Sequence, residues 1–131
     1  MTVIAASVDE RLRLAKDAAR EIGLLHSARK TALLHAVADA LETSSSEIVA
    51  ANAEDLDRGR HDAIGEALLD RLRLDDTRVA ALAAAVRDVA ELPDPVGRVL
   101  DRRTLPNGLQ LEKVAVPFGV VGSIYEARPN V

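Results

Sequence analysis

The sequence predicts an α/β fold in which a helical region is followed by a region of strands and turns. The first 92 residues contain no proline and are rich in alanine, whereas all five prolines and both aromatic residues lie in the last 39 residues. Alanine favours helices and proline interrupts them. The seam at residues 91–97, ELPDPVG, is therefore predicted to be an architectural boundary.

Apolar residues recur at steps of three and four before the seam, which is the period of one face of an α-helix. Ser27 is a plausible N-cap of a second helix. Ser44 and Glu47 have the spacing of a capping box that would begin a third helix. A short helix is predicted at residues 66–74, and Asp75 or Asp76 can cap the last one. The stripe of the first helix is Leu12, Ala15, Ala19 and Ile22.

Residues 98–116 are predicted to form a β-hairpin. Asn107 and Gly108 tolerate positive φ angles, which suits the tight turn between two twisted strands. Leu109, Leu111 and Ala115 occupy alternate positions, as in a strand with one exposed face.

The apolar stretch VVGSIY, residues 120–125, is predicted to be a strand of a parallel sheet, because such strands are buried on both faces. The predicted organisation is a helical part at 1–92, a hairpin at 93–117, and the first strand of a cofactor-binding fold at 118–131.

Composition excludes several classes of protein. A charged fraction of 29% and 48% apolar residues are ordinary for a globular domain, and the net charge of −4 gives no support to nucleic-acid binding. No window is long and apolar enough for a membrane span, so a cytoplasmic protein is expected. The chain has no cysteine, which excludes disulfides, thiolate metal sites and thiol nucleophiles within these 131 residues.

Several candidate motifs have simpler structural explanations. Gly119 and Gly122 do not have the strand-then-helix context of a dinucleotide fingerprint, and close backbone packing is the alternative. His35 and Asp39 share a helix face without a second cluster to complete a metal site. The acids and arginines of residues 54–62 are expected to form exposed ion pairs. Serines 44, 45 and 46 are explained by capping.

The segment YEARPN, residues 125–130, is the strongest candidate for a site. Ligands of open α/β sheets bind beyond the carboxyl ends of parallel strands, where this segment would lie. Asn130 could donate its amide to a developing oxyanion, and Arg128 could bind a phosphate or carboxylate. The alternative is that Glu126 and Arg128 pair on the surface while residues 129 and 130 turn the chain.

The string VAVPFGVVGSIYEARPNV, residues 114–131, resembles the signature of the gamma-glutamyl phosphate reductases, which belong to the aldehyde dehydrogenase superfamily. The resemblance extends upstream through LPDPVGRVLDRRTLPNGLQLEKVAVP and through KTALLHAVADALETSSSEIVAANAEDLDRGR. It thus covers nearly the whole chain, and YEARPNV is its most specific part. The fold that it implies is aldehyde dehydrogenase-like, of which this chain would supply the N-terminal helices, a hairpin and one strand.

The resemblance implies NADPH-dependent reduction of gamma-glutamyl phosphate to glutamate 5-semialdehyde, a step of proline biosynthesis. It implies contacts of Ile124, Tyr125, Glu126 and Ala127 with the cofactor, and of Arg128 and Asn130 with the substrate. An ungapped comparison places Arg128 nearer than Asn130 to the family's oxyanion asparagine.

The family's catalytic cysteine is absent from this chain, so these 131 residues are expected to be an inactive N-terminal portion. A poorly protected tail, prone to association, is also expected. By the same resemblance the hairpin would join subunits of a homo-oligomer. The alternative hypothesis is a freestanding helical module that binds a partner helix or a second copy of the chain.

Overall fold

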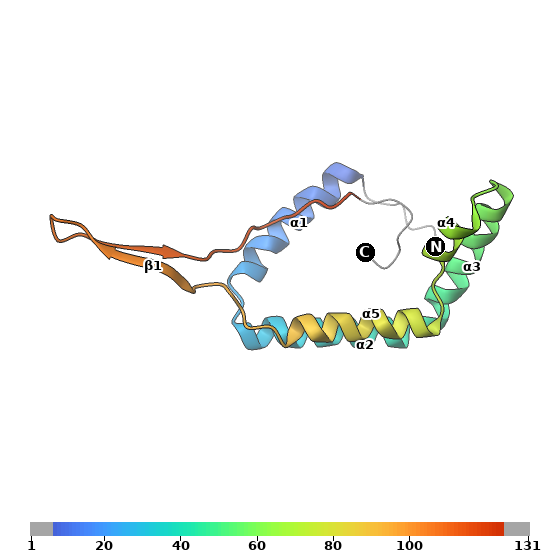
Figure 1. The fold of residues 1–131 in the computed structure, drawn as a ribbon, viewed down its shortest axis with the longest axis horizontal. Coiled ribbons are helices and arrows are strands. Elements are labelled where there is room, and N and C mark those ends of the chain that lie inside the picture. The colour runs from blue at the N-terminus through green and yellow to red at the C-terminus, as the bar shows by residue number, and fades with distance from the viewer. Residues whose placement is uncertain (1–6, 125–131) are drawn as a thin grey trace. The chain divides into compact units, whose positions relative to one another are not determined.

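The computed structural model describes residues 7–124, which form two compact units. Among the described residues, the hairpin unit comprises 7–27 and 93–122, and the helical unit comprises 28–92 with 123 and 124. Five α-helices precede two β-strands in the described part of the chain, in the order that the sequence predicts (Figure 1). The α/β fold class is thereby confirmed.

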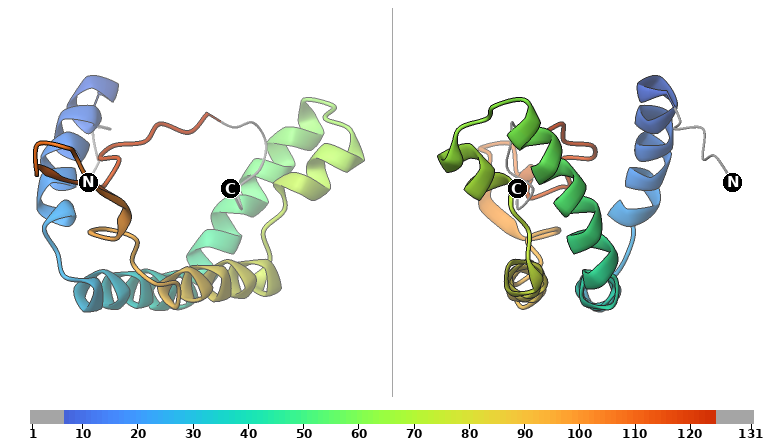
Figure 2. Two further views of the ribbon diagram at one scale, coloured as in Figure 1. Left: turned by 60° about the vertical axis from the view of Figure 1, so that its left-hand side comes forward. Right: turned by 90° about the vertical axis from the view of Figure 1, so that its right-hand side faces the viewer.

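The helical unit is built on two antiparallel helices, α2 (Ser27–Thr43) and α5 (Asp76–Ala90), which the right-hand view of Figure 2 shows nearly end-on. Their direction follows from contacts at opposite ends. The hydroxyl of Thr31 donates to the carbonyl oxygen of Ala90 at 3.5 Å, and that of Ser45 donates to the Asp76 carboxylate at 2.8 Å. Two further helices, α3 (Ser45–His61) and α4 (Glu66–Leu72), pack against each other, and α3 also contacts α5.

The core of the helical unit is small and consists mostly of short side chains. Gly59 on α3 is buried, and a Cβ atom added there would lie 2.9 Å from Cδ2 of Leu69, which is itself buried. Glycine therefore permits the close approach of α3 and α4. The buried apolar residues are Ala38, Leu56, Leu69, Val79, Ala83 and Ala90.

The hairpin unit contains α1 (Val8–Gly23) and the antiparallel strands β1 (Val99–Thr104) and β2 (Gln110–Val114). Ser7 caps α1 by accepting a hydrogen bond from the Glu10 amide at 3.2 Å. The predicted turn is confirmed: Gly108 has φ +85°, and the Asn107 side chain accepts from the Leu109 amide at 3.1 Å.

No residue of the hairpin unit is buried, as far as residues 7–27 and 93–122 show. Leu24, Val116 and Phe118 are each more than 70% exposed, and Leu12 and Ile22 of the predicted α1 stripe are about half exposed. A two-stranded hairpin is marginally stable by itself in water. This unit thus lacks a hydrophobic core of its own within the described residues.

Some local expectations differ from the structure. Ser27 is the first residue of α2 and not its N-cap, and its hydroxyl donates to the Asp94 carboxylate at 3.1 Å. Ser44 makes no side-chain cap to α3, because only this residue separates α2 from α3 and its φ of −92° and ψ of 10° lie outside the extended region that a capping side chain needs. Residues 115–124 form no strand, since no neighbouring strand pairs with them in the described part of the chain. Asp75, by contrast, caps α5 as predicted, accepting from the Arg78 amide at 2.8 Å.

Candidate functional site

Only one of the predicted ligand-binding residues lies in the described part of the chain. Ile124 follows the extended segment after β2, and its side chain is fully exposed. The other predicted cofactor and substrate residues lie outside the described residues, namely Tyr125, Glu126, Ala127, Arg128 and Asn130.

The two glycines before Ile124 have different backbone conformations. Gly119 has φ +87°, a value that L-residues rarely adopt. No φ in that range occurs at Gly122, and a Cβ atom at either glycine would meet no atom of the described residues within 4 Å. No close backbone packing occurs at these glycines within the described part of the chain. Gly119 is instead explained by its backbone conformation.

In the hairpin unit, the segment that follows β2 passes beside α1 (Figure 1). A groove lies between α1 and residues 117–120 of this segment. Its volume is about 710 Å³, and Cγ of Pro117 lies 3.7 Å from the Cβ position of Gly23. We call it the α1 groove. Its lining is apolar apart from two cations and consists of Leu12, Lys16, Ala19, Arg20, Gly23, Leu24, Pro117, Phe118, Gly119 and Val120.

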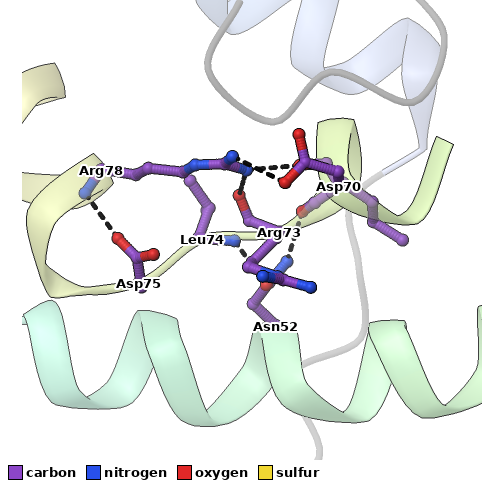
Figure 3. Close-up of polar contacts among 7 residues, drawn as sticks. Asn52, Asp70, Arg73, Leu74, Asp75 and Arg78 are labelled. Atoms are coloured by element: carbon purple, nitrogen blue, oxygen red, sulfur yellow. Dashed lines mark hydrogen bonds and ion pairs between the residues drawn. The ribbon is translucent and has the colours of Figure 1, made fainter. Parts of the chain in front are cut away.

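A buried asparagine joins α3 to the connection between α4 and α5 (Figure 3). Asn52 is 4% exposed; its Nδ2 donates to the carbonyl oxygen of Leu72 at 2.9 Å, and its Oδ1 accepts from the Leu74 amide at 2.6 Å. One side chain thus satisfies two backbone groups that lie outside regular hydrogen bonding. Asn52 is not among the residues predicted from the sequence.

Arg78 holds the same connection from the side of α5 (Figure 3). Its guanidinium donates to the carbonyl oxygen of Arg73 at 2.9 Å, to the Asp70 carboxylate at 2.9 Å, and to the Asp70 carbonyl oxygen. The cluster formed by Asn52, Asp70 and Arg78 therefore stabilises the connection and is not a reactive centre, because its donors and acceptors are already paired with one another or with the backbone.

A second ionic cluster joins α2 to α5. Arg87 binds both carboxylate oxygens of Glu42, at 2.7 and 2.8 Å, and one of Asp39 at 2.8 Å. The hydrogen bond from Arg87 lowers the pKa of Glu42, and the bonds to Glu42 and Asp39 raise the pKa of Arg87. Asp39 thus pairs with Arg87, and His35 lies 3.8 Å from Glu91, so these two residues do not form a ligand pair.

Other motifs follow the simpler explanations. Arg60 binds Asp57 at 2.6 Å, and Arg58 binds Asp55, all at exposed positions, which confirms the predicted ion pairs of residues 54–62. Within residues 7–124, no group of three acidic or histidine side chains could hold a metal ion. None of the helices described has the length and apolarity required to cross a membrane.

Comparison with curated proteins finds gamma-glutamyl phosphate reductases that match this chain over nearly its full length. A gamma-glutamyl phosphate reductase of Kineococcus radiotolerans is 56% identical over 130 residues, which are 99% of this chain and 30% of that protein. One of Thermobifida fusca is 50% identical over 131 residues, which are 100% of this chain and 31% of that protein. The chain thus spans about 30% of the length of these two relatives. No family model matches the chain.

Solved structures agree with the sequence comparison. The gamma-glutamyl phosphate reductase of Thermotoga maritima has a TM-score of 0.80 and 29% identity, covering 86% of this chain and 27% of its own. That of Saccharomyces cerevisiae has a TM-score of 0.72 and 30% identity, covering 85% and 29%. The likeness in fold therefore extends over most of this chain and over less than a third of each solved structure.

Proposed function

We propose that this chain, a member of the gamma-glutamyl phosphate reductase family by its sequence and fold, forms part of an enzyme that reduces gamma-glutamyl phosphate. The products would be glutamate 5-semialdehyde and phosphate, within cytoplasmic proline biosynthesis, and NADPH would supply the hydride. The supporting observation is 50–56% identity over essentially all of the chain to relatives of that name. A freestanding helical module is not favoured by these matches.

The described residues do not form a nucleotide site by themselves. Of the four proposed cofactor residues only Ile124 is described, and its side chain is exposed. The proposal therefore concerns a cofactor site completed by other parts of the enzyme. We assign four residues to that site from their positions in the sequence alone: Ile124, Tyr125, Glu126 and Ala127.

The chemistry of the substrate defines the tasks of the two proposed substrate residues. An acyl phosphate carries phosphate oxygens that an arginine can bind through two parallel hydrogen bonds. Attack on its carbonyl carbon places negative charge on the carbonyl oxygen, which an asparagine amide can stabilise. We assign the first task to Arg128 and the second to Asn130.

We expect the 131-residue chain to be inactive, because it has no cysteine to attack the acyl phosphate. The test is a fusion enzyme in which this chain replaces the matching 131 residues of the Thermobifida fusca relative. NADPH oxidation should depend on gamma-glutamyl phosphate for the fusion enzyme and be absent for the chain alone. Oxidation by the chain alone, or a folded but inactive fusion enzyme, would contradict the proposal.

We also propose that the hairpin at residues 98–116 takes part in subunit association. Within the described structure β1 and β2 pair only with each other, so each strand has one unpaired edge, and such an edge can pair with another chain. Replacing residues 98–116 of the fusion enzyme by a short linker should lower its sedimentation coefficient while its circular dichroism keeps the helical signal. Unchanged sedimentation would count against this role.

A further inference from the structure

The α1 groove lies in a part of the molecule that buries nothing by itself. Among residues 7–27 and 93–122 no side chain is buried, although Leu12, Phe118 and Val120 carry large apolar surfaces into or beside the groove. Contiguous exposed apolar surface of this kind marks an interaction site in soluble proteins. The groove therefore needs a cover that the described residues do not provide.

Charge indicates what kind of cover fits. Lys16 and Arg20 are one helical turn apart on α1 and both line the groove, whereas no acidic residue does. Neither cation makes an ion pair with another described residue. An apolar floor with two unpaired cations at its side is complementary to a segment that carries apolar side chains and carboxylates.

The length of the relatives indicates where that segment comes from. The curated relatives are about three times as long as this chain. The Thermotoga maritima structure has a similar fold over 86% of this chain and also continues well beyond the matched part. Resting on the proposed function, we propose that the α1 groove binds an acidic, partly apolar segment from the remaining part of the reductase. The groove would then be an internal interface of the enzyme, and its cover would supply the core that the hairpin unit lacks.

Site-specific alkylation can test this interface. Ala19 lines the α1 groove, whereas its neighbour Ala18 is exposed and does not, so Ala19→Cys and Ala18→Cys are matched variants. Because the chain has no cysteine of its own, each thiol reports one position, and peptide mass spectrometry separates it from cysteines elsewhere in the fusion enzyme. Leu12→Cys provides a second groove position should Ala19→Cys perturb α1.

The thiol of Ala19→Cys or of Leu12→Cys is expected to react about tenfold more slowly in the fusion enzyme than in the 131-residue chain. In the fusion enzyme the covering segment must open locally before the reagent reaches the thiol. Ala18→Cys should react at similar rates in both. If each of these two thiols reacts at the same rate in the fusion enzyme and in the 131-residue chain, the proposal is overturned. Protection in the 131-residue chain that grows with its concentration would instead identify a second copy as the occupant, which also overturns it.

Charge variants test the acidic character of the cover. Lys16→Gln with Arg20→Gln, placed in the Ala19→Cys fusion enzyme, should reduce the protection several-fold, and 1 M salt should act in the same direction. Arg11→Gln with Arg13→Gln removes the same charge from α1 outside the groove and should leave the protection unchanged. Equal effects of the two pairs would contradict an acidic partner segment.

The assay separates this inference from the proposed function. NADPH oxidation is measured on a portion of the same fusion enzyme that has not been exposed to the alkylating reagent. An active fusion enzyme with unprotected groove positions refutes the inference alone. An inactive one with protected positions refutes the proposed activity and leaves the groove as an interface.

Discussion

Asn52→Ala is expected to destabilise the helical unit by about 2–4 kcal/mol, because it leaves two backbone groups without partners in a buried setting. The Leu72 carbonyl and the Leu74 amide both bind the Asn52 side chain, which is 4% exposed. Urea unfolding followed by circular dichroism measures the change. Asn107→Ala is the control, since Asn107 binds the Leu109 amide in an exposed turn and its loss should leave the helical transition unchanged.

Asn52→Asp distinguishes loss of hydrogen bonds from a general packing defect. The carboxylate could still accept from the Leu74 amide but would face the Leu72 carbonyl oxygen, and burial together with that oxygen raises the pKa of an aspartate there. A folded-state pKa above the unfolded value means that the variant gains stability as pH falls through the folded pKa. The difference in unfolding free energy between Asn52→Asp and Asn52→Ala should therefore shift in favour of Asp between pH 7 and pH 4. A pH-independent difference would contradict the proposed hydrogen-bond role.

The helices and the hairpin turn were predictable because their signals are local. Five helices follow from apolar periodicity, and the Asn107–Gly108 turn follows from residues that tolerate positive φ. The capping box predicted at Ser44 does not form, and the reason is also local. A single residue between two helices cannot adopt the extended backbone of an N-cap, and the S-x-x-E pattern does not reveal how closely the preceding helix ends.

Asn52 could have been found from the sequence. It lies three residues after Val49 and four before Leu56, at a position of the α3 apolar stripe where a polar side chain must find partners. The identity of those partners could not be predicted, because Leu72 and Leu74 are some twenty residues away and reach Asn52 only through tertiary packing.

The strand predicted from VVGSIY shows the limit of a composition argument. Apolar continuity indicates burial, but a strand also requires a neighbour with which to share hydrogen bonds. Residues 115–124 have no such neighbour in the described part of the chain and form no strand there. Phe118 and Ile124 are fully exposed because the same contacts are missing. The α1 groove, which residues 117–120 help to line, is uncovered as well.

Asn130→Ala in the fusion enzyme is expected to lower kcat by about 10²–10³, the usual effect of removing one oxyanion donor. Because this donor would act on charge that develops in the transition state, KM for gamma-glutamyl phosphate should change little. Arg128→Ala should have the opposite pattern: a raised KM with a smaller change in kcat, since a phosphate-binding arginine contributes to ground-state and transition-state binding alike. Steady-state kinetics of both variants, with equal thermal midpoints as evidence of folding, measure this split.

The two variants also decide between the alternative assignments. If Arg128→Ala lowers kcat and Asn130→Ala raises KM, the roles are exchanged, as the ungapped comparison with the family suggests. Asn130→Asp sharpens the test, because it keeps the size of the side chain but replaces the amide donor with a carboxylate next to the developing oxyanion. Its kcat should fall at least as far as that of Asn130→Ala. Wild-type kcat and KM in all three variants would mean that residues 128–130 only turn the chain, with Glu126 and Arg128 paired on the surface.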